Sequence, residues 1–377
     1  MKKIIIILSI ILSSCSSYKN FSNQEIIIKK GGKQEFTLDN NFMKIEATIN
    51  NEKEYFHFDT GAQSSVIMDS VYLNKINKEK KELIKGISLT GANAVKIQSY
   101  DFISDVVNCN FFAAKNKIFK YIKINKISQT CNNTSGNSVG IIGYDFIESS
   151  EIPILLNFET KTIEAISGFS NYTKSAIKIK KLGSKIIMPF EINGKTINFL
   201  FDTGNSGGFK MKTSDFNEIK APEVIISALY DVVSGVTEMK MKTYFDNSIF
   251  FENEKLESKL MVNDNTHVNT VGIEFIKKYN WIFDFKNNIV YYKKIAKEVK
   301  DIFEKPKINI QSISLNNRLL VGFKTNFYNG NYNLNDQIIS VNNQKVTPEN
   351  ICEMQTLLNS TQNWETLKLE VIPAKKE

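Results

Sequence analysis

The chain carries the tripeptide Asp-Thr-Gly twice, as Asp59-Thr60-Gly61 and as Asp202-Thr203-Gly204. Each aspartate follows a run of apolar residues, so we expect each carboxyl group at the end of a buried strand. A single carboxylate in such a place is costly, because burial disfavours its charged form. Two carboxyl groups that lie side by side share one proton, and the pair can then activate a water molecule. The sequence therefore predicts Asp59 and Asp202 as a catalytic pair.

These tripeptides belong to a longer internal repeat. They lie 143 residues apart, and at the same offset Asn50-Asn51 corresponds to Asn193-Gly194. Each dipeptide is a hairpin-turn signal between alternating strands, which we expect at 45–49, 53–58, 188–192 and 195–201. Further along, Ile142-Gly143-Tyr144-Asp145-Phe146-Ile147 matches Val271-Gly272-Ile273-Glu274-Phe275-Ile276. A chance tripeptide would not keep its neighbours in register, so we expect two homologous lobes that each supply one aspartate.

Residues 59–65, which read Asp-Thr-Gly-Ala-Gln-Ser-Ser, and the segment Ile141-Ile142-Gly143 resemble the signature pair of the retropepsin-like and pepsin-like aspartic proteases. In the second repeat, Gly272 belongs to a weaker counterpart of the Ile-Ile-Gly segment. The resemblance implies a mainly β, bilobed, acid-protease-type barrel, with a cleft between lobe 1 (residues 34–166) and lobe 2 (residues 178–298). It also implies an aspartic endopeptidase that binds extended or unfolded polypeptide and uses no cofactor or metal.

The same resemblance assigns roles to the neighbours of the two aspartates. Thr60 and Thr203 are expected to hydrogen-bond across the lobe interface and lock the two loops in register. Gly61 and Gly204 are expected to allow the tight turn and to let a backbone N–H approach each carboxylate.

Two further expectations concern the surroundings of the pair. The segments around Gly91 and Gly235 are expected to be hairpin flaps, of which the first closes over substrate and excludes water. His57 lies two residues before Asp59 on the same strand face. It is expected to pack or hydrogen-bond there, and the alternative role is to tune the acidic pair.

The stretch Asn205-Ser206-Gly207-Gly208 departs from the usual second loop and motivates an alternative function. In this alternative the protein is a non-catalytic, peptide-binding envelope lipoprotein that keeps the protease fold, because its second loop fails to bring Asp202 against Asp59. Catalysis requires the two carboxyl groups to lie within hydrogen-bonding reach, and the two hypotheses separate on that distance.

Composition excludes two other classes of function. The 377 residues carry a net charge of +8, which comes almost wholly from lysine, since Arg318 is the single arginine. Nucleic-acid readers depend on arginine for bidentate contacts, so a nucleic-acid partner is not expected. With two histidines in the chain and no Cys/His cluster at ligand spacing, a zinc hydrolase is not expected either.

The N-terminus resembles a bacterial lipoprotein signal. Lys2-Lys3 precedes an apolar stretch at 4–12, which is too short for a permanent membrane span, and Leu12-Ser13-Ser14-Cys15 follows. The resemblance implies cleavage before Cys15, lipidation of that residue, and a polar tether at 16–33. The mature protein would then be lipid-anchored in the cell envelope, outside the cytoplasm. The alternative is an ordinary secretory signal with a chance cysteine.

Three cysteines remain. Cys109 and Cys131 both fall in lobe 1, and in an oxidising envelope we predict a disulfide between them, with an unpaired buried cysteine as the alternative. Cys352 is expected to be a core residue.

The pattern changes near residue 301. Residues 334–346, which read Leu-Asn-Asp-Gln-Ile-Ile-Ser-Val-Asn-Asn-Gln-Lys-Val, and the helix expected at 348–358 after Thr347 resemble the PDZ domain. Residues 303–377 are therefore expected to form a small αβ PDZ-like domain that binds a peptide or protein ligand. The usual glycine-containing carboxylate loop is not evident, and the alternative is a small αβ cap packed on lobe 2.

Overall fold

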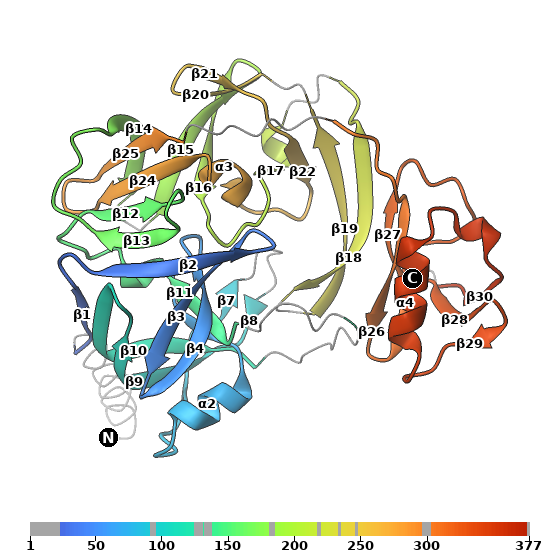
Figure 1. Ribbon diagram of the computed structural model, residues 1–377, viewed down its shortest axis with the longest axis horizontal. Coiled ribbons are helices and arrows are strands. Elements are labelled where there is room, and N and C mark those ends of the chain that lie inside the picture. The colour runs from blue at the N-terminus through green and yellow to red at the C-terminus, as the bar shows by residue number, and fades with distance from the viewer. Residues whose placement is uncertain are drawn as a thin grey trace, which may run out of the picture.

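The computed structural model describes residues 23–90, 96–123, 131, 138–180, 185–216, 220–232, 235–245, 248–295 and 303–374. The prediction of a mainly β chain is confirmed, since about half of the residues lie in strands. Figure 1 shows a β-rich body with a separate C-terminal module at one side. Among the described residues, no helix is long and apolar enough to cross a membrane. The signal at 1–15, residues 16–22 of the expected tether and Gly91 lie outside the described residues.

The first half of the body (residues 23–165) contains a closed six-strand barrel. Its strands pair in the order β3-β4-β11-β5-β10-β9, and β9 returns to β3. Their bounds are β3 Phe42–Ile49, β4 Glu52–Asp59, β11 Gly140–Gly143, β5 Val66–Ile67, β10 Phe112–Tyr121 and β9 Tyr100–Asn108. The barrel encloses a core of large apolar side chains, including Phe56, Phe102 and Phe119.

The second half (residues 173–294) repeats this order as β15-β16-β23-β17-β22-β19, with the same strand direction at every step. The bounds are β15 Lys185–Ile192, β16 Lys195–Phe201, β23 Thr270–Val271, β17 Phe209–Lys212, β22 Leu260–Asn263 and β19 Gly235–Tyr244. The other edge of β15 pairs with β20 (Ile249–Phe251). The structure therefore carries the internal repeat that the sequence indicates.

The two hairpin turns form as predicted. Asn50 and Asn51 have φ values of 47° and 70°, and Asn193 and Gly194 have φ values of 51° and 79°. Both turns need two consecutive left-handed residues, which asparagine and glycine tolerate best. These turns fix the register of the strands that lead to the two aspartates.

A shared sheet joins the two halves. Its order is β2-β13-β12-β24-β25-β14, and the pairing of β12 with β24 crosses from one half to the other. The bounds are β2 Lys33–Asp39, β13 Thr162–Ala165, β12 Ile154–Asn157, β24 Tyr279–Asp284, β25 Ile289–Lys294 and β14 Thr173–Lys180. One continuous hydrophobic cluster runs from Phe36 to Val290, so the halves are packed as a single body.

Further elements complete the body. They are β1 Glu25–Ile28, β6 Ile84–Lys85, β7 Leu89–Thr90, β8 Lys96–Ile97, β18 Val224–Val232, β21 Glu254–Leu256, α2 Ser70–Ile76, α3 Ile273–Ile276, and the 3-10 turns η1 Tyr144–Phe146 and η2 Thr213–Asp215. Asp69 caps α2 by accepting a hydrogen bond from the Tyr72 N–H at 2.8 Å.

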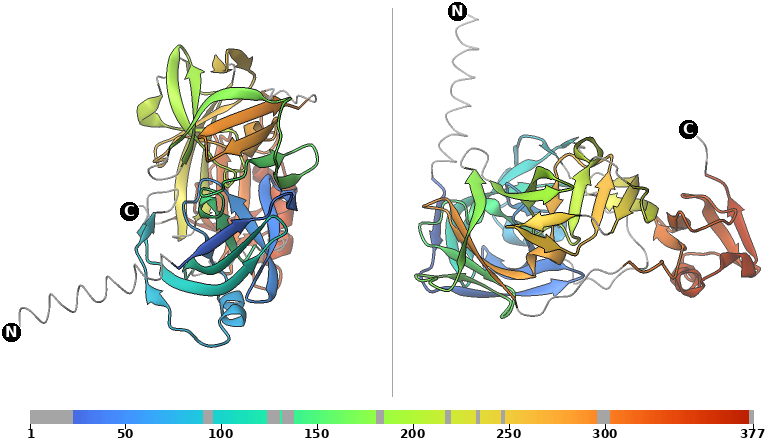
Figure 2. Two further views of the ribbon diagram at one scale, coloured as in Figure 1. Left: turned by 90° about the vertical axis from the view of Figure 1, so that its left-hand side faces the viewer. Right: turned by 90° about the horizontal axis from the view of Figure 1, so that it is seen from above.

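The C-terminal module (residues 303–374) has its own small core, in which Trp364 and Leu358 are fully buried. It contains β26 Ile310–Leu315, β27 Arg318–Thr325, β28 Gln337–Val341, β29 Gln344–Lys345, α4 Ile351–Ser360, η3 Trp364–Thr366 and β30 Leu369–Ile372. Strand β27 lies between β26 and β28, and β28 also pairs with β30. Figure 2 shows the module at one end of the elongated molecule.

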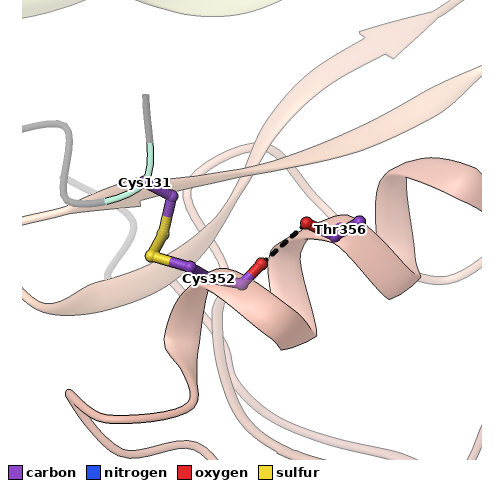
Figure 3. The surroundings of a disulfide bond; sticks show 3 residues. All are labelled: Cys131, Cys352 and Thr356. Atoms are coloured by element: carbon purple, nitrogen blue, oxygen red, sulfur yellow. Dashed lines mark hydrogen bonds between the residues drawn. A yellow bond between two sulfur atoms is a disulfide. The ribbon is translucent and has the colours of Figure 1, made fainter. Parts of the chain in front are cut away.

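The module is joined to the body in two places. Strand β27 pairs with β18, so the sheet of the second half continues into the module. On the other side, Cys131 of the first half forms a disulfide with Cys352 at the start of α4, with a Cα–Cα distance of 5.0 Å (Figure 3).

The disulfide corrects two predictions. The predicted bond between Cys109 and Cys131 is wrong, because Cys109 is a free thiol buried in the first half, where its Sγ donates to Gln34 Oε1 at 3.1 Å. Cys352 is exposed and bonded to Cys131, so it is not a core residue. The short sequence separation of Cys109 and Cys131 favoured the predicted bond, but Cys131 lies beside α4 of the module.

Candidate active site

Two equivalent strand ends bring Asp59 and Asp202 together. Strand β4 ends on Asp59, and β16 ends on Phe201, immediately before Asp202. The buried side chains of Phe58 and Phe201 hold the two strand ends in the core. Asp202 also keeps the ladder to β23, since its N–H donates to the Val271 carbonyl at 3.0 Å. The carboxyl groups therefore project from rigid strand ends rather than from free loops.

Thr60 and Thr203 connect the two loops directly. The Thr60 N–H donates to Thr203 Oγ1 at 3.0 Å, and the Thr203 N–H donates to Thr60 Oγ1 at 3.1 Å. Each hydroxyl then donates to a carbonyl of the other half, Thr60 to Phe201 at 2.9 Å and Thr203 to Phe58 at 2.7 Å. Both threonines are buried, so these bonds are shielded from competing water.

The glycines permit the close approach of each loop to the opposite carboxyl group. A methyl group at Gly61 would lie 2.5 Å from Asp202 Oδ1, and one at Gly204 would lie 2.4 Å from the Asp59 Cγ. Both distances are far inside van der Waals contact, so any larger residue would push the two carboxyl groups apart. The pair thus depends on glycine at both positions.

The two carboxyl groups lie close enough for each to change the pKa of the other. Burial raises the pKa of Asp59, although bonds from Asp202 and from backbone N–H groups oppose the shift. Burial also raises the pKa of Asp202 well above its usual value, and the charge and hydrogen bond of Asp59 add to the rise. Because two neighbouring carboxyl groups resist ionising together, the pair favours holding a single shared proton.

Backbone donors distinguish the two aspartates. Asp59 Oδ1 accepts from the N–H groups of Gly61 at 2.8 Å and Ala62 at 3.0 Å. Asp202 Oδ1 accepts from the Gly204 N–H at 2.9 Å. Because N–H donors stabilise the ionised form, the arrangement favours the negative charge on Asp59 and the proton on Asp202.

The Ile141-Ile142-Gly143 segment forms β11, which lies beside β4 and beneath the first loop. The Tyr144 N–H donates to the Ala62 carbonyl at 2.8 Å, and the Gly143 N–H donates to Ser65 Oγ at 2.9 Å. A methyl group at Gly143 would lie 2.8 Å from the Ala62 oxygen, so glycine is needed for this contact. The segment therefore holds the first loop in place through hydrogen bonds to Ala62 and Ser65.

A buried ion pair that the sequence analysis missed supports the same loop. Lys117 Nζ lies 2.6 Å from Asp145 Oδ2, and their side chains are 5% and 14% exposed. Asp145 Oδ1 also accepts from Ser65 Oγ at 2.7 Å. The signal was present in the sequence, since Asp145 and Glu274 occupy the same place after Gly143 and Gly272 in the two repeats.

The second loop is supported in the same manner. The Ile273 N–H donates to the Asn205 carbonyl at 2.9 Å, and Gly272 packs so closely that a methyl group there would lie 2.3 Å from that oxygen. The Asn205 side chain closes the loop by donating to Thr270 Oγ1 at 2.9 Å and accepting from the Gly207 N–H at 3.1 Å. The side-chain amide of Asn205 therefore holds the Asn205–Gly208 loop in its conformation.

His57 packs rather than contacting the pair. Its ring lies 5.3 Å from that of Phe42, and its buried Nδ1 has no hydrogen-bond partner among the described residues. Burial lowers its pKa, and the nearby Lys44 charge lowers it further. The ring is therefore neutral near pH 7.

Both predicted flap segments contain hairpins. In the first, β7 pairs with β8 through Leu89 and Ile97, while its tip with Gly91 lies outside the described residues. In the second, Gly235 opens β19 and pairs with Val232 of β18. This second hairpin is the one whose sheet continues into the C-terminal module.

Within the described part of the chain, no group of three or more His, Cys, Asp or Glu residues has an arrangement that would hold a metal ion. The arrangement of Asp59 and Asp202 offers acid–base chemistry on a bound water, with one carboxylate and one carboxylic acid. Comparison of the chain with protein-family models gives no match. Comparison with curated proteins gives no match either.

Proposed function

We propose that the protein is an aspartic endopeptidase, in which Asp59 and Asp202 activate a water molecule to hydrolyse a peptide bond. One observation carries the proposal: two Asp-Thr-Gly loops from equivalent halves meet so closely that a methyl group on Gly61 would lie 2.5 Å from Asp202 Oδ1, and one on Gly204 would lie 2.4 Å from the Asp59 Cγ. A half-buried pair of this kind is unfavourable for stability, because desolvation and mutual repulsion both disfavour its charge. Groups whose pKa values are perturbed in this way are concentrated at functional sites.

The donors around the pair suggest the roles of the two groups. The Asp59 carboxylate takes a proton from the water, whose oxygen attacks the substrate carbonyl carbon. Asp202 donates its proton to the carbonyl oxygen, which yields a neutral tetrahedral intermediate. Asp59 then gives its proton to the leaving nitrogen as the C–N bond breaks, and the new acid returns a proton to Asp202. No covalent intermediate with the enzyme is needed.

The family we propose is that of the retropepsin-like and pepsin-like proteases, with two lobes in one chain and a cleft between them. Support comes from the repeated strand order of the two halves and from the glycine-dependent loops described above. The substrate would be an extended segment of polypeptide that adds to strand edges near the pair. The binding-only alternative assumed that Asn205–Gly208 displaces Asp202, and the close approach of Asp202 to Gly61 of the first loop argues against that displacement.

For the C-terminal module we propose a PDZ-like fold with a role in holding the body together. Its β26 edge is partly occupied, since Asn359 on α4 accepts from the Ser312 N–H at 2.7 Å and donates to the Ser312 carbonyl at 3.1 Å. A peptide that adds along β26 must therefore displace Asn359. We also propose lipid anchoring through Cys15 in the cell envelope, on the strength of the N-terminal signal alone.

The decisive experiment is cleavage of an unfolded protein by the purified full-length chain between about pH 3.5 and 7.5, with Asp59→Asn and Asp202→Asn in parallel. We expect both variants to lose activity, and a statine-type transition-state mimic to block the parent. Activity that survives either substitution would refute the shared pair. Peptide binding without cleavage at any pH would favour the binding-only alternative.

A further inference from the structure

Lys210 lies in the second half near Asp202, and no step of the proposed reaction uses it. It belongs to a row of residues that are directly paired across β16, β23 and β17. In the second half, Leu200 lies opposite Thr270, and Thr270 lies opposite Lys210. Directly paired residues share one face of a sheet, and so do residues two apart on a strand. Lys210 and Asp202 therefore lie on the same face. The opposite face carries the buried core residues Phe201, Val271 and Phe209.

The equivalent row in the first half is uncharged at this position. There, Ile141 lies opposite His57 on one side and opposite Val66 on the other. Val66 thus occupies the place that Lys210 has in the second half. The second loop is one residue longer, since Val66 follows Asp59 by seven positions and Lys210 follows Asp202 by eight. The extra residue places a lysine at a position that holds a valine in the other half.

The charge of Lys210 is not neutralised by a salt bridge with any described residue, although the next lysine on the strand, Lys212, pairs with Asp215 at 3.2 Å. The Lys210 side chain is half-buried. Burial lowers its pKa, and the charge of Asp202 acts in the opposite direction. The ammonium group is therefore close enough to Asp202 for the two charges to interact, and it is partly shielded from water. Among the described residues it donates no hydrogen bond.

We propose that Lys210 is a specificity residue that binds the carboxylate of a substrate side chain held next to Asp202. The inference rests on the proposed peptidase function and names its substrate class: polypeptide segments with Glu or Asp close to the scissile bond. A half-buried ammonium group gains strongly from a carboxylate ligand, because charge-assisted hydrogen bonds strengthen away from bulk water. The net charge of +8 also favours the approach of acidic segments. The Val66 side of the site, in contrast, suits an apolar side chain.

The test uses the full-length protein and matched peptides that differ only by Glu or Gln at each position near the cleaved bond. At the position served by Lys210, we expect the parent to favour Glu in kcat/KM by about 10- to 100-fold. Lys210→Met should reduce that ratio to near one, Lys210→Arg should keep it, and Lys210→Glu should invert it in favour of a Lys peptide. Lys212→Met is the matched control, on the same strand and face, and should leave the ratio unchanged.

A Glu/Gln ratio that stays unchanged in Lys210→Met would overturn the inference. So would a uniform shift of the pH profile for all peptides, since Lys210 would then act only on the acidic pair. Direct binding of the same peptides, followed by fluorescence anisotropy, separates this inference from the proposed function. If the parent cleaves nothing, the peptidase proposal fails, and the Glu preference in binding and its loss in Lys210→Met still decide the role of Lys210.

Discussion

Thr60 and Thr203 hold each other through reciprocal hydrogen bonds, in which each backbone N–H donates to the other residue's hydroxyl, at 3.0 and 3.1 Å. Each hydroxyl in turn donates a hydrogen bond to a backbone carbonyl of the opposite half. The two loops are thus joined by four buried bonds that depend on two side-chain oxygens. Because the aspartates directly precede these threonines, the bonds also set the distance between the two carboxyl groups.

Thr203→Val removes one of these oxygens while keeping the shape of the side chain. It leaves the Thr60 N–H and the Phe58 carbonyl buried without partners, which costs about 1–3 kcal/mol for each group. We expect a lower urea midpoint and at least a tenfold loss of peptidase activity as the loops lose register. Thr203→Ser keeps the oxygen and should retain most of both. An unchanged urea midpoint in Thr203→Val would contradict this account.

Gly204→Ala should abolish activity, because its methyl group would lie 2.4 Å from the Asp59 Cγ and force the carboxyl groups apart. We expect at least a hundredfold loss in kcat/KM, with less effect on the strand content seen by circular dichroism. The control is Gly168→Ala, since a methyl group there meets no atom within 4 Å. Equal activity in the two variants would show that the close approach is unimportant.

The acidic pair should make the protein less stable as the pH rises. Burial raises the pKa of both groups in the native state, whereas in the unfolded chain they ionise near pH 4. Between these limits the native state binds more protons than the unfolded state, so this contribution to stability falls as pH rises through the raised pKa. Asp202→Asn removes the penalty. Melting curves at about pH 4 and 7.5 should show that the variant becomes more stable relative to the parent at the higher pH. We expect its free energy of unfolding to rise relative to that of the parent by about 1 kcal/mol or more.

Melting curves with equal pH dependence in the parent and in Asp202→Asn would contradict a raised pKa at the pair. All other titrating groups are the same in both proteins, so the difference between the two curves isolates Asp202 and its partner.

Lys117→Met should destabilise the protein by about 3–5 kcal/mol, because it leaves the Asp145 carboxylate buried without its cation. Activity should also fall, since Asp145 holds Ser65 beneath the first loop. Lys286→Met is a matched control: its pair with Glu151 is 61% and 75% exposed, so its loss should have little effect on stability. Urea unfolding of both variants provides the comparison, and similar costs would argue against a structural role for the buried pair.

Cys352→Ser should lower the free energy of unfolding by about 2–5 kcal/mol, because the disulfide closes a long loop in the unfolded chain. Cys131→Ser and the double variant should match it, since each loses the same bond. Peptide mapping without reductant should show the linked peptides directly. A linkage that involves Cys109 would contradict the structure.

Local patterns predicted the parts of the fold that depend on neighbouring residues. The strand expected at 195–201 is β16 Lys195–Phe201, and the one at 53–58 lies within β4. The helix expected from 348 begins at Ile351 instead, after a turn at 348–350 in which Asn350 Oδ1 accepts from the Thr347 N–H at 2.8 Å. Helix ends fray over one or two residues, so the first turn of a helix is difficult to place from the sequence.

Features that depend on distant parts of the chain were not predictable from the sequence. The spacing of Cys109, Cys131 and Cys352 gives their separation along the chain, and the disulfide depends on their separation in space. The pairing of β27 with β18 joins edges about 100 residues apart, and no local pattern marks one edge for the other. The position of Lys210 follows from one extra loop residue, whose effect appears only when the strands are in register.

The disulfide between Cys131 and Cys352 turns most of the polypeptide into a covalent ring that contains Asp202 and leaves Asp59 on the arm outside it. A foreign protease that cuts the chain once anywhere within this ring cannot release a fragment, because both pieces stay tethered through sulfur. The nicked molecule would keep its mass on a gel without reductant and separate only after reduction. A protein exposed to other proteases therefore tolerates a single cut in its longest stretch without losing either aspartate.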